Sequence, residues 1–160
     1  MNSKQVLNVR MMKSIYLLSF IALLSGVVLP IQAVLNAKLG KTVGDPIYGA
    51  LISFIIGGLG LLLYCLIVRT DFSQITQATS SNWLIWTGGL MGAFYVVAVI
   101  ILVPKMGTAL TFGLVIAGQM GFSLVMDHYG WFGAPIQAIS WQKILGVLLI
   151  IGGAILLRVI

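Results

Sequence analysis

Apolar residues form five long runs along the 160-residue chain, separated by short polar breaks. A helix needs ~20 mostly apolar residues to cross ~30 Å of hydrocarbon, and each run is about that long. Because a span in lipid must satisfy its backbone hydrogen bonds internally, we predict that all five are α-helices. A basic N-terminal tail, residues 1–13, precedes one five-helix domain, residues 14–160, whose predicted spans are 14–35, 47–68, 83–103, 108–126 and 141–159.

Proline, acidic and tryptophan residues mark where several spans should begin or bend. Asp45 and Pro46 stand directly before the second span, where an acidic residue and an N-terminal proline favour the start of a helix. Trp83 and Trp86 open the third span, so we expect them at the depth of the lipid headgroups. Pro30 lacks a backbone donor and is predicted to kink the first helix.

The composition agrees with a membrane protein and narrows its class. Hydrophobic residues make up 60% of the chain and charged residues 8%, which leaves too little polar surface for a globule in water. The spans leave no room for an extramembrane catalytic or nucleic-acid-binding domain. We do not expect a cleaved signal peptide, because the first apolar run exceeds the ~7–15 residues of a signal core and lacks a small-residue cleavage site.

Small residues recur at four-residue spacing inside the spans. In lipid such spacing lets helix backbones approach closely, and the association is driven by van der Waals contact. Packing within one chain and packing between two subunits are both consistent with the pattern. The glycines that we predict to pack in this way are Gly49, Gly57, Gly88, Gly92 and Gly121.

The polar residues within the spans are neutral. The chain has no Glu, and its three Asp residues fall at the ends of spans, which argues against an exchanger that relies on a carboxylate near the membrane midplane. Two polar pairs, each with four-residue spacing, lie on single helix faces. These candidate substrate-binding residues are Gln32 with Asn36, and Gln119 with Ser123. Alternatively, they bridge helices and contribute about 1 kcal/mol each.

Asp127 and His128 follow the fourth span and form the place where the chain could respond to pH near neutrality. We consider them a possible gate, or alternatively a simple helix cap and interfacial anchor. Cys65 lies inside an apolar run and is interpreted as a packing residue. Because no nucleophile stands with a base and no metal-ligand cluster is present, we expect no enzyme activity, cofactor or metal.

Basic residues give little instruction about orientation in the membrane. The two sides of the membrane receive nearly equal numbers of Lys and Arg, five against four. If translation began at Met11 or Met12, Lys4 and Arg10 would be lost, and the other side would then carry more basic residues. With no internal repeat in the chain, two copies inserted in opposite directions would supply the inverted symmetry that many transporters use. Threading the spans divides the nine basic residues into five on one side, Lys4, Arg10, Lys13, Arg69 and Lys143, and four on the other, Lys38, Lys41, Lys105 and Arg158.

Several segments of the chain together have the pattern of a known family: 30–40, 86–93, 115–119, Ser123-Leu124, 127–130 and 143–153. On these segments the chain resembles the drug/metabolite transporter (DMT) superfamily, and within it the small five-helix bacterial YdcZ-like family. The resemblance implies a bacterial inner-membrane transporter whose relatives occur as single genes, opposed pairs or fused ten-helix forms. The four-helix exporters of the superfamily use a glutamate in the first helix, which has no counterpart here.

These observations lead to two hypotheses of different classes. In the first, the chain is half of a ten-helix inverted-repeat transporter, paired with itself or with a homologous subunit of opposite orientation. It would carry a small neutral or amphipathic molecule across the inner membrane past Gln32, Asn36 and Gln119. In the second, it is a non-transporting scaffold or accessory subunit, whose polar residues only bridge helices. The lipid bilayer is the partner in both, and nucleic acid in neither.

Overall fold

A computed structural model describes residues 3–80 and 82–159, with side chains described for residues 15–76, 78 and 82–157. Within these ranges the chain is helical and contains no strand, which confirms the predicted all-α membrane fold with five main helices. Four of these helices are long and apolar enough to cross a bilayer, and the fifth has a shorter apolar segment, Trp141–Leu157. In order, the elements are α1 (Ser3–Val43), α2 (Pro46–Val68), η1 (Phe72–Ser80), η2 (Trp83–Trp86), α3 (Thr87–Met106), α4 (Thr108–Tyr129), η3 (Trp131–Gly133) and α5 (Trp141–Val159), where η denotes a 3₁₀ helix.

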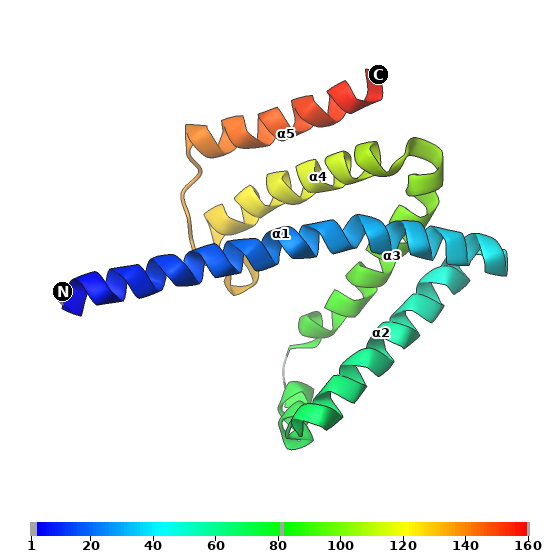
Figure 1. Cartoon of the computed structure of the whole chain (residues 1–160), viewed down its shortest axis with the longest axis horizontal. Helices are drawn as coiled ribbons and strands as arrows, with labels where there is room; N and C mark the ends of the chain where they lie inside the picture. Colours follow the sequence, from blue (N-terminus) through cyan, green and yellow to red (C-terminus); the bar gives the residue numbers. More distant parts are fainter. Residues whose placement is uncertain (1–2, 81, 160) are drawn as a thin grey trace.

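Helix α1 is longer than the predicted first span at both ends. Much of the expected N-terminal tail is helical from Ser3, and the C-terminal end extends to Val43 instead of residue 35. Alanine, leucine and lysine in this extension favour helix, and Gly44 ends it with a left-handed φ of 83°. The helix also runs unbroken through Pro30, and Figure 1 shows no sharp bend along α1. The kink predicted at Pro30 is therefore not observed.

The other helix ends follow local signals more closely. The Asp45 side chain caps α2 by accepting a hydrogen bond of 2.6 Å from the backbone N–H of Ile47, with Pro46 in the first turn. The third span begins as the 3₁₀ turn η2, which is common at helix starts. Helix α4 continues three residues beyond its predicted end, because the left-handed conformation that stops it is at Gly130, with φ 63°.

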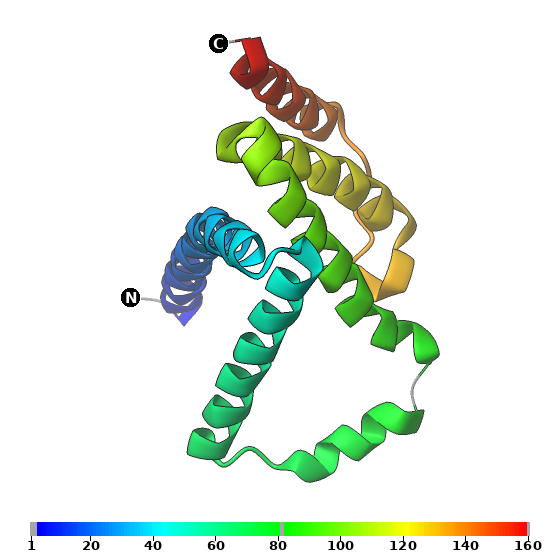
Figure 2. The same ribbon diagram turned by 90° about the vertical axis from the view of Figure 1, so that its right-hand side faces the viewer.

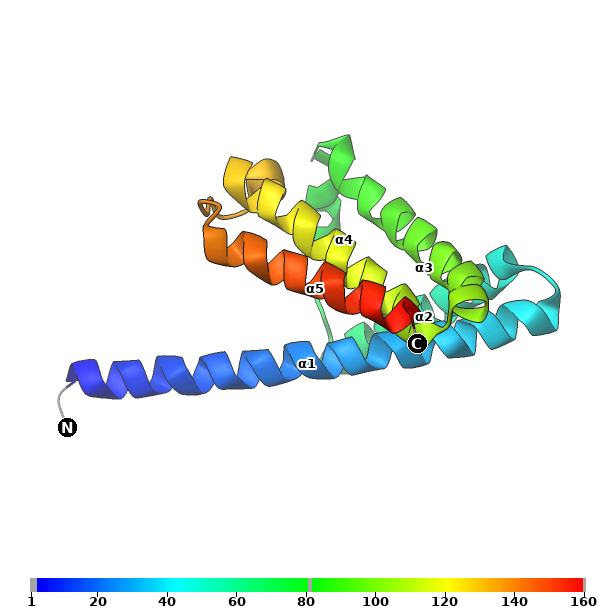
Figure 3. The same ribbon diagram turned by 90° about the horizontal axis from the view of Figure 1, so that it is seen from above.

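The helices form an open arrangement around α1 and α3. Helices α4 and α5 lie side by side and run in opposite directions, whereas α1 passes alongside α2, α3 and the beginning of α4 (Figures 1 and 3). Figure 2 shows that α2 and α3 lie close together near the α1–α2 turn and diverge toward their other ends, which η1 connects. The diverging ends therefore leave broad helix faces without a neighbour from the same chain.

The buried core is small and lies where α1, α3 and α4 meet. It contains Ala33, Val99, Val103 and Phe112. Outside this core most large apolar side chains are exposed, and the most apolar 18-residue stretch of α2 has no buried residue. Such surfaces are expected to face lipid or another subunit.

Candidate functional site

A narrow cleft between α1 and α3 brings together Gln32, Asn36 and Tyr95. Gln32 and Asn36 are one helical turn apart on α1, and Tyr95 faces them from α3 in a half-buried position. Apolar side chains, among them Val99, complete the walls. The cavity is about 10 Å³, which is room for about one water molecule.

The Asn36 side chain is the most informative group in this cleft. It is 8% exposed, and no other group in the described part of the chain forms a hydrogen bond with it. The amide atoms are not completely sealed from the cleft, so a molecule bound there could satisfy their donors and acceptor.

Close packing between α1 and α2 holds Asn36 in place. A Cβ atom built at Gly49 would lie 2.7 Å from the Cα atom of Gly40 and 3.1 Å from the backbone oxygen of Asn36. Only glycine permits this approach, which seats α2 against the turn of α1 that carries Asn36. The position of the cleft therefore depends on the Gly40–Gly49 contact.

A second cavity, of about 410 Å³, lies between α4 and α5 and is lined by Ser123, Asp127 and Lys143. The Lys143 ammonium group donates hydrogen bonds of 3.1 Å each to the Gln137 side-chain oxygen and the Ala138 backbone oxygen. These bonds direct the lysine toward the α4–α5 connection. The same connection is held to α4 by a 2.8 Å hydrogen bond from the Gln137 backbone N–H to the Asp127 backbone oxygen.

The sequence-predicted site residues therefore divide between separate places. Gln32 and Asn36 share the α1–α3 cleft, whereas Ser123 and Asp127 share the α4–α5 cavity. Gln119 is exposed near the midpoint of α4, one helical turn from Ser123. His128 is also exposed, at the end of α4, with its ring edge-on to the ring of Tyr129 at a centroid distance of 4.9 Å.

The predicted packing glycines differ in their surroundings. Gly49 contacts the α1 backbone, and a Cβ at Gly92 would meet the Phe54 ring at 3.6 Å, an ordinary contact distance. No neighbour within the described chain lies within 4 Å of a Cβ placed at Gly57, Gly88 or Gly121. These three therefore lie on faces that this single chain leaves uncovered.

Two site residues were not anticipated from the sequence. Tyr95 could have been noticed as a hydroxyl inside an otherwise apolar span, but only the packing of α3 on α1 places it beside Asn36. Lys143 had been considered only as a charge at a span end, and its cavity exists because α5 lies against α4. Among the described side chains, no three His, Cys, Asp or Glu residues gather as they would in a metal site.

Comparisons with known proteins agree with this membrane architecture. Residues 17–156 match the family model DMT_YdcZ, described as "Putative inner membrane exporter, YdcZ". The chain is also 27% identical over 131 residues to a protein named inner membrane protein YdcZ from Escherichia coli (strain K12), covering 81% of this chain and 87% of that protein. No solved structure matches the chain. The family points to transport and not to catalysis, and to a multi-pass protein of the bacterial inner membrane. The chain belongs to the YdcZ family of inner membrane exporters.

Proposed function

We propose that the chain exports a small neutral or amphipathic molecule through the α1–α3 cleft, and that it works as an antiparallel dimer by alternating access. The observation that carries the proposal is Asn36, a buried amide without an internal hydrogen-bond partner that faces a cavity. An amide that has no partner within the described chain and remains accessible from a cleft is a candidate binding group. The exporter family supports the transport assignment.

The chemistry of the cleft favours an uncharged cargo group. Gln32 and Asn36 offer amide donors and acceptors, and Tyr95 offers a phenol hydroxyl. No charged side chain of the described residues lines the cleft, and its remaining walls are apolar. A molecule with one neutral hydrogen-bonding end and an apolar body would match these walls without leaving a buried charge unpaired.

The cleft as it stands corresponds to a closed form. Its volume of about 10 Å³ is far below the ~300–1,000 Å³ of typical small-molecule sites. Cargo binding therefore requires α1 and α3 to move apart. Pro104 lies inside the last turns of α3 and has no N–H to donate to the Ile100 carbonyl, which weakens the helix beside the cleft.

The exposed amides and glycines support a second subunit. Gln119 lies near the midpoint of α4, is exposed, and has no hydrogen-bond partner in the described chain. Placing an unpartnered amide in hydrocarbon costs about 4–8 kcal/mol. A partner that covered α4 would relieve this cost, and the uncovered Gly57, Gly88 and Gly121 would let its helices approach closely.

An opposed partner suits the position of the cleft. Asn36 lies two residues before Lys38, so it is near one end of the hydrophobic part of α1. The cleft therefore lies in one half of the membrane, between the middle of the α1 span and that end. An inverted partner would present the same cleft to the other surface, which is the symmetry that alternating access uses.

Ligand-dependent thermal stabilisation tests the binding site. Purified full-length protein is screened against a library of neutral and amphipathic metabolites, and the variants Gln32→Leu and Asn36→Leu are compared with Ser25→Ala. Ser25 is a suitable control because its hydroxyl bonds to the Ile21 backbone oxygen of its own helix, at 2.9 Å. We expect at least one compound to stabilise the parent and the control but neither cleft variant. Equal stabilisation of all four proteins would assign the cleft amides a packing role.

Tagging both termini and measuring their accessibility from each side of the membrane tests the pairing. We expect each terminus on both sides in comparable amounts. One fixed orientation, in cells that express no homologous partner, would contradict the antiparallel dimer. The proposal that the cleft binds cargo would not be affected, because the thermal-stabilisation assay tests it separately.

A further inference from the structure

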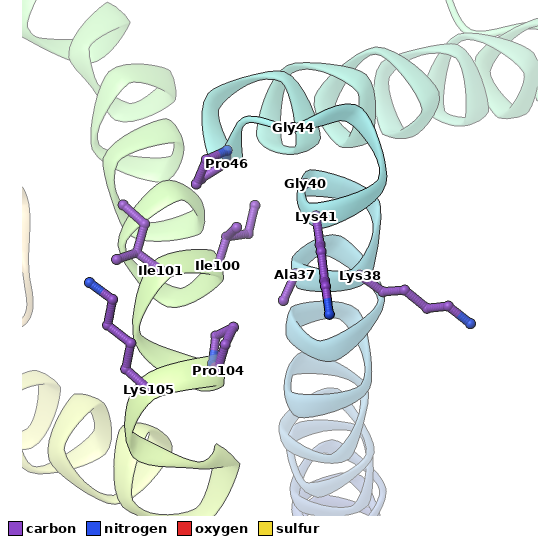
Figure 4. A pocket seen from close by; sticks show the side chains of 10 residues that line it. All are labelled: Ala37, Lys38, Gly40, Lys41, Gly44, Pro46, Ile100, Ile101, Pro104 and Lys105. Atoms are coloured by element: carbon purple, nitrogen blue, oxygen red, sulfur yellow. The ribbon is translucent and has the colours of Figure 1, made fainter.

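A cavity of about 610 Å³ lies at the end of the bundle where α1 turns into α2 and α3 turns into α4. Its floor is apolar and includes Pro46, Ile100 and Pro104. Figure 4 shows Ile100 and Pro104 on the side of α3 that faces α1 across the cavity. Ile100 also lines the Asn36 cleft, so the two cavities share a wall but have different polar groups.

Three lysines, Lys38, Lys41 and Lys105, surround this apolar floor. All three are exposed, and within the described chain none of their ammonium groups forms a hydrogen bond or an ion pair. In Figure 4 the Lys41 side chain lies along α1 beside the cavity, while Lys38 and Lys105 extend outward on either side. Their long flexible stems allow the ammonium groups to converge on a bound anion.

No acidic side chain of the described residues lines the cavity. The nearest acid in sequence is Asp45, in the α1–α2 turn, and its carboxylate accepts a hydrogen bond from the Ile47 backbone. The rim therefore keeps a net positive charge. Because both helix turns lie where the hydrophobic spans end, this charge is expected at the depth of the lipid headgroups.

A separate apolar groove lies further along α1, toward its N-terminus, and shares no lining residue with the cavity. The groove, about 330 Å³, is lined by residues of α1 between Pro30 and Leu35 and by Thr108 of α4. Val34 in the groove and Ala37 and Lys41 in the cavity follow at spacings of three and four, so they lie on one face of α1.

We propose that this cavity and groove bind one anionic phospholipid, with its phosphate among Lys38, Lys41 and Lys105 and one acyl chain along α1. Basic pockets between transmembrane helices at the membrane surface are suited to anionic headgroups. A free phosphate ion would leave the apolar floor and the groove unused. The site is separate from the Asn36 cleft and does not depend on the identity of the exported molecule.

Native mass spectrometry of the detergent-solubilised full-length protein tests the proposal. Three probes are titrated: phosphatidylglycerol, phosphatidylethanolamine with the same acyl chains, and glycerol phosphate. We expect one phosphatidylglycerol per chain, at least tenfold weaker binding of phosphatidylethanolamine, and no measurable binding of glycerol phosphate. Binding of glycerol phosphate as tight as that of phosphatidylglycerol would overturn the lipid assignment.

A pair of variants with equal charge loss separates the site from general attraction. In Lys38→Gln/Lys41→Gln we expect phosphatidylglycerol affinity to fall about 25-fold, at about fivefold for each lysine. The control Lys4→Gln/Arg69→Gln removes the same charge at two residues that are remote in sequence from the cavity lining, and it should bind as the parent does. Unchanged binding by the first variant, or an equal loss in the control, would contradict the proposal.

Two single substitutions test the two parts of the site independently. Lys105→Gln changes one exposed rim residue on α3, and we expect about a fivefold loss of phosphatidylglycerol affinity. Val34→Trp fills the apolar groove from α1 and should weaken phosphatidylglycerol binding while leaving all three lysines in place. Full affinity in both variants would overturn the site even if the double variant failed to fold.

Discussion

The Gly40–Gly49 contact gives the sharpest quantitative prediction, through the substitution Gly49→Ala. The added Cβ would lie 2.7 Å from the Cα and 2.8 Å from the nitrogen of Gly40, where ordinary contacts are 3.4–4 Å. Both neighbouring atoms are backbone atoms and cannot rotate away. Helices α1 and α2 must therefore separate by roughly 1 Å, which forfeits a quarter to a half of each contact's attraction.

The expected loss follows from comparison with a glycine that has no neighbours. Forced overpacking costs about 1–3 kcal/mol, whereas replacing glycine by alanine in a helix gains up to about 1 kcal/mol. Gly57 lies two turns further along α2, and nothing in the described chain is within 4 Å of a Cβ placed there. At a dilution at which the protein is monomeric, Gly57→Ala should therefore leave the stability of the folded chain unchanged or raise it. We expect Gly49→Ala to be about 1–3 kcal/mol less stable than Gly57→Ala.

Equilibrium unfolding by sodium dodecyl sulfate in mixed micelles measures this difference, with tryptophan fluorescence and circular dichroism as probes. All samples share one protein concentration, because association would shift the apparent stability. If Gly49→Ala proved as stable as Gly57→Ala, the close approach of α1 and α2 would be refuted. The explanation of how Asn36 is positioned would be refuted with it.

Two further predictions concern the surface and the α2–α3 connection. If the Gln119 amide forms a hydrogen bond across the interface, Gln119→Leu should weaken dimerisation by about 1 kcal/mol. Energy transfer between labelled subunits in vesicles measures the dimerisation free energy. A tighter dimer would indicate that Gln119 faces lipid. The backbone N–H and then the hydroxyl of Ser73 hydrogen-bond the Asp71 carboxylate and hold its pKa below the ordinary value. Because folding lowers the pKa of Asp71, the ionised carboxylate stabilises the folded state. This stabilisation is fully present above the ordinary pKa of an aspartate and is lost as the pH falls through the lowered pKa. Ser73→Ala should raise the pKa of Asp71 in an NMR titration, without effect at neutral pH, and an unchanged pKa would refute this role of the hydroxyl.

The helices could largely be predicted from sequence because their limits are set by local chemistry. The cap Asp45 and the first-turn Pro46 fixed the start of α2. The end of α1 was missed because polarity suggested an exit near Asn36, although the residues up to Val43 can continue a helix. Pro30 was expected to kink α1, but a helix in lipid can pass through proline when its surroundings compensate for the lost hydrogen bond.

The site could be predicted only in part, because helix periodicity places residues on one helix and cannot show which helix lies opposite. The four-residue spacing of Gln32 and Asn36 correctly indicated a shared face. Gln119 and Ser123 had the same spacing, yet they lie away from that cleft. The role of Tyr95 and the basic rim of Lys38, Lys41 and Lys105 required the packing of α3 against α1.

Export that depends on Asn36 is the most direct test of the proposed mechanism. The measurement compares small molecules released into the medium by cells expressing the parent or Asn36→Leu, at equal protein abundance in the inner membrane. We predict that at least one neutral or amphipathic metabolite accumulates outside cells with the parent and not outside cells with the variant. If cells with Asn36→Leu released every metabolite that the parent exports at the same rate as cells with the parent, transport through the α1–α3 cleft would be contradicted.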